Sequence, residues 1–67
     1  SQSVEVRRGE SDVAEDLKAV AGEYADLSFG SYPFNDGDGW GTNLVVRGLD
    51  EARVAEGMAV LKQRLGL

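Results

Sequence analysis

Three aromatic residues stand on either side of two aspartates in the middle of this chain. Tyr32 and Phe34 precede Asp36 and Asp38, and Trp40 follows them. Aromatic side chains on a sheet can stack on unpaired nucleic-acid bases or anchor a protein contact. Paired carboxylates can bind a cation or exchange protons with a substrate. This stretch therefore holds the side chains best suited to binding or catalysis.

The composition restricts that chemistry, because the chain contains no histidine and no cysteine. Without these residues, histidine-based triads, thiolate nucleophiles and most zinc sites are excluded. We therefore predict no catalytic residue, no metal ligand and no cofactor site in this chain. By the same reasoning the chain is not expected to be an enzyme by itself.

The acidic pair has the residue types of a calcium loop but not its pattern. Asp36 and Asp38 follow Asn35, and all three side chains carry oxygen ligands. The EF-hand pattern also requires a glutamate at a fixed distance after its glycine, and Asn43 and Val45 occupy the possible positions. Acid–base work by two carboxylates requires a buried cleft that separates their pKa values. We expect these aspartates to be solvated on an exposed loop.

The glycines around this pair suit a turn better than a phosphate site. Gly37, Gly39 and Gly41 lie between two apolar stretches, whereas a phosphate loop leads from a strand into a helix and often carries Lys or Arg. The Gly-x-x-Gly loop that clamps a nucleic-acid backbone between two helices is also missing. The pattern predicts a β-hairpin.

The charge balance disfavours phosphate partners. Seven Lys and Arg against twelve Asp and Glu give a net charge of −5, which repels nucleic acid and anionic membranes. We predict an interaction surface with at least two of its aromatics partly exposed, for an adjacent domain of a parent protein or a second subunit. A single-stranded nucleic acid stacked on the aromatic sheet face is the alternative. The candidate residues of this surface are Tyr32, Phe34, Trp40, Asp36, Asp38 and Arg47.

Hydrophobic periodicity predicts the elements that position these residues. Alternating residues predict strands over 3–7, 27–34 and 42–48, with a hairpin loop over 35–41. Apolar stripes with helical spacing predict one helix capped by Ser11 and another capped by Asp50. Pro33 has no amide hydrogen, so we expect this end of the second strand to be an edge or already part of the loop.

The order βαββα predicts an α+β fold, a two-layer sandwich. We expect a three-stranded mixed sheet of order 1-3-2, with both helices on one face. The strand alternation and the helix stripes define the expected core. It comprises Val4, Val6, Val13, Leu17, Val20, Leu27, Phe29, Leu44, Val46, Val54, Met58, Leu61 and Leu65.

The length of 67 residues allows one small domain, residues 1–67. The chain starts without Met and reaches a strand almost at once, which predicts a domain excised from a longer protein or, alternatively, a processed terminus. It has neither a signal peptide nor an apolar run long enough to span a bilayer, so we expect a cytoplasmic location without membrane contact.

One part of the chain resembles a known family. Residues 29–34 read Phe-Gly-Ser-Tyr-Pro-Phe, and residues 40–50 read Trp-Gly-Thr-Asn-Leu-Val-Val-Arg-Gly-Leu-Asp. This pattern resembles the small KH-type domain that follows the molybdopterin-binding-like domain in the competence/damage-inducible protein A (CinA) family. The likeness covers nearly the whole chain. Asp36 and Asp38 make the loop more acidic than is usual for that family.

The resemblance implies a function that the residues alone do not. It implies a non-catalytic accessory domain of a nucleotide-utilising protein, which positions or caps the adjacent catalytic domain or helps it to dimerise. The parent protein would be a nucleotide hydrolase or deamidase.

Overall fold

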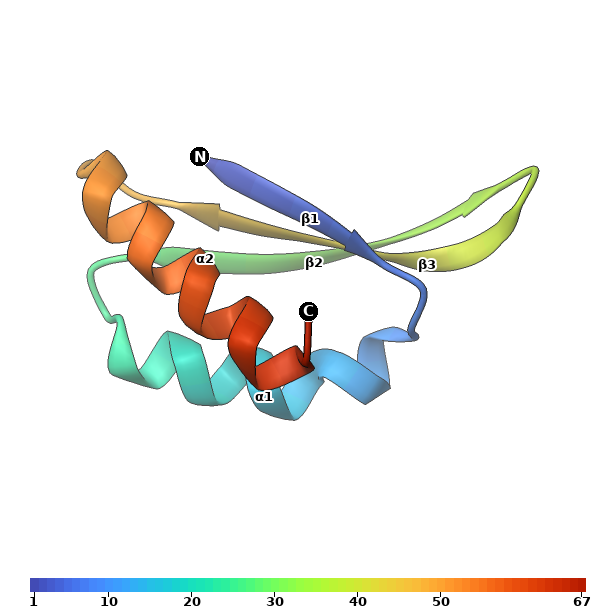
Figure 1. Ribbon diagram of the computed structural model, residues 1–67, viewed down its shortest axis with the longest axis horizontal. Coiled ribbons are helices and arrows are strands. Elements are labelled where there is room, and N and C mark those ends of the chain that lie inside the picture. Colours follow the sequence, from blue (N-terminus) through green and yellow to red (C-terminus); the bar gives the residue numbers. More distant parts are fainter.

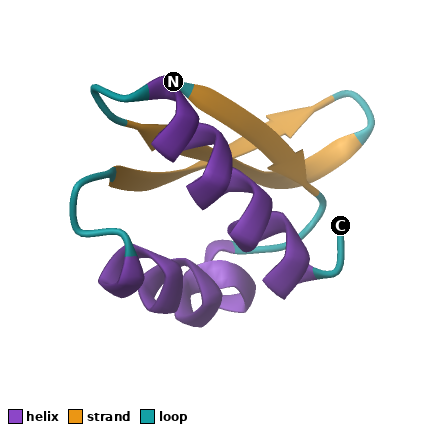
Figure 2. Ribbon diagram, turned by 60° about the vertical axis from the view of Figure 1, so that its left-hand side comes forward, coloured by secondary structure: helices purple, strands orange, loops and turns teal.

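Two helices cover one face of a three-stranded sheet in the computed structural model, which describes residues 1–67 (Figure 1). The elements in chain order are β1 (Gln2–Val6), α1 (Glu10–Glu23), β2 (Ser28–Asp36), β3 (Gly39–Arg47) and α2 (Glu51–Leu65). Figure 2 shows the two layers, with both helices on the same side of the sheet. The predicted α+β sandwich and the position of its helices are confirmed.

The strand order is β1-β3-β2, as predicted. Both neighbouring pairs are antiparallel, so the sheet is antiparallel and not mixed. The two outer strands do run in the same direction, because each is antiparallel to β3. They are separated by β3 and form no parallel pair, which is why the expected mixed pairing is absent.

The core lies between the sheet and the helices and is centred on β3. Leu44 and Val46 of β3 are fully buried, and so are Val13 and Val20 of α1. Three expected core residues, Val4, Leu17 and Phe29, are only partly buried at the margins of this cluster. Tyr24 is buried in addition to the expected set. The remaining buried apolar residues are Val6, Leu27, Val54, Met58, Leu61 and Leu65.

One helix cap follows the prediction and the other does not. The Asp50 carboxylate accepts hydrogen bonds from the Ala52 and Arg53 amides, at 2.9 and 3.4 Å, and caps α2. The N-cap of α1 is Gly9, which has no side chain to cap with, and Ser11 lies within the first turn. The connection before α1 is instead fixed by Thr42, whose buried hydroxyl donates to the Arg8 carbonyl at 2.7 Å.

The hairpin is longer and its turn shorter than predicted. β2 continues to Asp36 and β3 begins at Gly39, so only Gly37 and Asp38 remain in the turn. Gly39 has a φ of 126°, which favours glycine, and the Asp36 carboxylate accepts the Asp38 amide at 2.9 Å. The turn residues therefore support pairing up to the tip. The hairpin extends beyond the helices and gives the molecule a long axis of 35 Å (Figure 1).

Gly57 allows α2 to approach the sheet closely. It is buried in the middle of the helix, and a methyl group at this position would come within 2.7 Å of the Leu27 side chain. The propensity cost of a helical glycine is about 1 kcal/mol relative to alanine. In this helix the glycine permits the close packing of α2 on Leu27, which a larger residue would prevent.

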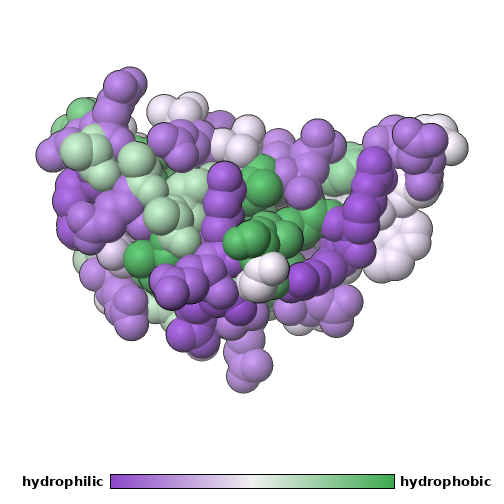
Figure 3. All heavy atoms as spheres, in the orientation of Figure 1, coloured by the Kyte–Doolittle hydropathy of each residue, from purple (hydrophilic) through white to green (hydrophobic).

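The surface on the side of α2 is mainly hydrophilic, with apolar side chains between α2 and β1 (Figure 3). Val4 and Val60 are half-buried against the core, and Leu67 is 57% exposed. Neither helix has the length and apolar character that crossing a membrane requires.

Leu61 provides a direct test of this core. It is fully buried, so we predict that Leu61→Ala lowers the free energy of unfolding by about 2–5 kcal/mol. Leu49→Ala is the matched control, because Leu49 is fully exposed and its loss leaves no cavity. Urea denaturation followed by circular dichroism measures both changes. Equal midpoints for the two variants would contradict this description of the core.

Candidate functional site

The strand register divides the predicted interaction residues between the two faces of the sheet. Residues paired across neighbouring strands share a face, and faces alternate along each strand. Phe29 and Val46 pair and face the helices, so Tyr32, paired with Asn43, lies on the opposite side. We call that side the open face. It carries Ser3, Glu5, Gly30, Tyr32, Phe34, Asp36, Gly41, Asn43, Val45 and Arg47.

An arginine, an aromatic ring and a carboxylate form a cluster at the hairpin end of the open face. The Arg7 guanidinium lies 5.2 Å from the centroid of the Phe34 ring. Two of its nitrogens donate to the two oxygens of Asp36, at 3.4 and 3.3 Å. Both charged side chains are about half exposed. The cluster joins the end of β1 to the end of β2 across β3, although solvent screens an exposed pair of this kind and keeps its contribution to stability small.

Gly41 lies beneath the Phe34 ring and is required there. A methyl group at this position would come within 2.9 Å of the ring and would also meet the Val6 carbonyl oxygen. Gly41 is itself buried, and it pairs with Phe34 in the register. The absent side chain therefore lets the ring lie flat on β3, which explains why Phe34 is half-buried on a face that no helix covers.

Tyr32 is the large apolar side chain of the open face that stays exposed. Its relative exposure is 51%, and its ring lies over Gly30 of the same strand. A shallow hollow of about 80 Å³ beside it is lined by Val45 and Arg47. The ring, a β-branched side chain and a cation are therefore next to one another and accessible.

Trp40 does not belong to this surface. It pairs with Asn35 and points to the helix side of the sheet, near the N-terminus of α1, where it is 60% exposed. Its ring is close to Gly9, where a methyl group would come within 3.4 Å of it. Asp38 lies in the turn between the faces. The six predicted residues thus form no single surface, because Tyr32, Phe34, Asp36 and Arg47 share the open face without Trp40 and Asp38.

Arg7 was not among the predicted interaction residues, although it contacts both Phe34 and Asp36. The alternation of β1 contained the signal, since Ser3, Glu5 and Arg7 all follow the same parity. Trp40 was grouped wrongly because a loop over 35–41 interrupts the alternation that places it. No group of three or more acidic side chains in the chain is arranged to hold a metal ion.

The pKa of Asp36 is lowered below its ordinary value of 3.8, first by the hydrogen bonds from Arg7 and then by the Asp38 amide. The folded protein therefore binds this proton more weakly than the unfolded chain. The cluster contributes its stability above the unfolded pKa, and this contribution is lost as pH falls through the folded pKa.

We predict that Arg7→Ala returns the pKa of Asp36 toward its ordinary value. Carboxyl chemical shifts followed by NMR between neutral and acid pH measure this directly. Arg47→Ala is the matched control, since Arg47 lies on the same face but forms no hydrogen bond to Asp36. An Asp36 titration that is identical in the wild type and in Arg7→Ala would show that the pair does not form in solution.

The comparisons with known proteins give one match. The family model described as the middle domain of FAD synthase matches residues 1–67. No curated protein and no solved structure matches the chain.

This match overturns the resemblance to the CinA family and to molybdopterin-binding-like proteins, together with the nucleotide hydrolase or deamidase that it implied as parent. The motif that suggested it has a structural explanation. Pro33 suits the edge strand and Gly41 makes room for the Phe34 ring, so both satisfy the geometry of the hairpin. Gly41 is therefore explained by the packing of Phe34, and Pro33 is compatible with an edge strand, so neither residue by itself identifies a family.

Proposed function

This chain belongs to the family of FAD synthase middle domains, and from that premise we propose that it is a non-catalytic docking domain. Its open face would contact another part of FAD synthase, either an adjacent domain or a second subunit. The observation that carries the proposal is Tyr32, half exposed on a sheet face that no element of this chain covers.

The energetics of aromatic burial support this use of the open face. A tyrosine can bury about 150–250 Å² when a partner covers it, and tyrosines are enriched among the residues that dominate binding. The Tyr32 ring already rests on Gly30, so little side-chain freedom is lost on binding. Phe34 and Arg7, held against Gly41 and Asp36, would form a preorganised rim beside it.

The charges around Tyr32 suit a protein partner. Glu5 and Asp36 share the open face with Arg7 and Arg47, so the face presents both signs. Asp38 at the turn would favour a partner that presents Lys or Arg, mainly through orientation and the rate of encounter. Binding of single-stranded nucleic acid stays an alternative prediction, and it lacks the basic groove that usually accompanies stacking on a sheet.

The ends of the chain are compatible with a position inside a longer protein. A middle domain has, by its name, neighbours on both sides. Ser1 and Leu67 are both exposed. The absence of histidine and cysteine favours a non-catalytic role for this domain, with the chemistry performed elsewhere in the enzyme.

We predict that Tyr32→Ala weakens the affinity of this domain for the rest of FAD synthase by about tenfold or more. Calorimetric titration of the domain into an enzyme lacking it measures this affinity, and urea denaturation checks that the variant is folded. Trp40→Ala is the matched control, because Trp40 is an exposed aromatic on the other side of the sheet. Equal losses for the two variants, or no loss for Tyr32→Ala, would refute docking through the open face.

A further inference from the structure

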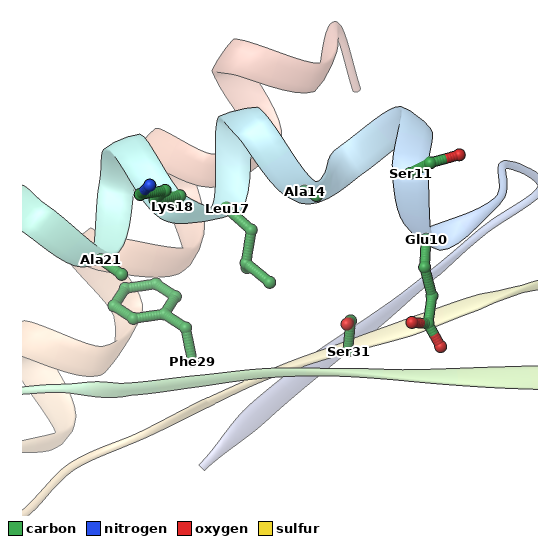
Figure 4. Close-up of a pocket in the computed structure, with 8 residues that line it drawn as sticks. All are labelled: Glu10, Ser11, Ala14, Leu17, Lys18, Ala21, Phe29 and Ser31. Atoms are coloured by element: carbon green, nitrogen blue, oxygen red, sulfur yellow. The ribbon is translucent and has the colours of Figure 1, made fainter.

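A second surface, separate from the open face, lies along the outer edge of β2. A groove of about 580 Å³ runs between this edge and α1. Figure 4 shows Leu17 of α1 and Phe29 of β2 both pointing into it, with Lys18 toward one end and Glu10 toward the other. Ala14 and Ala21 complete its apolar lining. The groove is thus apolar in the middle and oppositely charged at its two ends.

The backbone beside this groove is free to pair. In an antiparallel hairpin alternate residues bond to the partner strand, and here the pairing starts at Asp36 and Gly39 around a two-residue turn. Counting back from Asp36, the amides and carbonyls of Phe29 and Ser31 point away from β3. Pro33 also points outward but has no amide hydrogen. The exposed edge can therefore accept a strand over residues 29–31 and is blocked beyond them.

The two charges at the ends of the groove have no partners within the chain. None of the four ion pairs involves Glu10 or Lys18. The two residues lie on the same side of α1, about 12 Å apart along the helix axis from a rise of about 1.5 Å per residue. An occupant with a positive group near Glu10 and a negative group near Lys18 would therefore complement the groove at both ends.

We propose that this occupant is a second copy of the chain, related by a two-fold axis. An antiparallel arrangement of two grooves brings Glu10 of each copy to Lys18 of the other, so the surface is complementary to itself. A register centred on Gly30 pairs Phe29 with Ser31 of the second copy, twice, and leaves Pro33 outside. The two sheets then join edge to edge, and the alanines let the two α1 helices approach.

The net charge of −5 does not prevent this pairing. Charges more than about 8 Å apart are largely screened at physiological ionic strength. The close pairs between Glu10 of one copy and Lys18 of the other therefore outweigh the net repulsion between the two chains. The surface is also distinct from the open face and does not depend on the proposed docking function. Loss of one interface would leave the other intact.

Sedimentation equilibrium of the 67-residue chain over a concentration series tests the proposal. We expect a reversible dimer, with Lys18→Glu and Glu10→Lys each raising its dissociation constant by about tenfold, through two repulsive contacts per dimer. The double variant with both changes should restore the affinity, because positions 10 and 18 of the two copies again carry opposite charges that attract. Lys62→Glu is the matched control for the altered net charge and should dimerise like the wild type.

A steric variant tests the same interface without charge reversal. Ala14→Arg places a bulky residue near the two-fold axis and should abolish the dimer, whereas Ala59→Arg on the exposed side of α2 should not. Circular dichroism checks that each variant is folded. The proposal is overturned by a monomer at every concentration, by a double charge variant that stays as weak as the single ones, or by a dimer that survives Ala14→Arg.

Discussion

The burial of β3 is the constraint on which the rest of the structure depends. Leu44 and Val46 on the central strand must lie beneath both helices, because no other surface of the chain can cover them. A chain of 67 residues has helices for one face of the sheet only. Once that face is covered, no element of the chain remains to cover the other face or the outer edge of β2. These two exposed regions are where the candidate functions lie.

Two arginines lie over aromatic rings and bind carboxylates, one at each end of the molecule. Arg7 lies over Phe34 and binds Asp36 on the open face. At the opposite end of the molecule, Arg53 lies 4.7 Å from the centroid of the Tyr24 ring and donates to Asp26 at 2.8 and 3.0 Å. Each arrangement joins segments that are distant in sequence. Tyr32 has no such cover, which distinguishes it from Phe34 on the same face of the sheet.

Local patterns were sufficient to predict the architecture. The alternation around Leu44 and Val46 and the apolar stripes of both helices specify which side of each element is buried, and Asp50 marks the start of α2. Prediction failed where the outcome depends on distant contacts. Asn35 and Trp40 look like loop residues, yet the register continues through them to the tip. Tyr24 is buried partly because its hydroxyl donates to Glu56 of α2 at 2.8 Å, a contact that no local pattern contains.

The candidate site was predictable only in part for the same reason. The aromatic and acidic residues were found by type, but their division between two faces requires the exact length of the turn. The groove beside α1 was not predicted at all, because Leu17 and Phe29 were expected to be buried in the core. The family was also misjudged, from a motif that includes Gly41, a residue explained by the packing of the Phe34 ring.

The proposed docking function requires that the open face is covered when the domain is part of FAD synthase. Hydroxyl-radical footprinting of the isolated domain and of the full-length enzyme measures this through the oxidation rates of Tyr32 and Trp40. Both aromatics are exposed in this structure, so both should react readily in the isolated domain. We predict that the rate at Tyr32 falls severalfold in the full-length enzyme while the rate at Trp40 is unchanged. An equal rate at Tyr32 in the two proteins would contradict the claim.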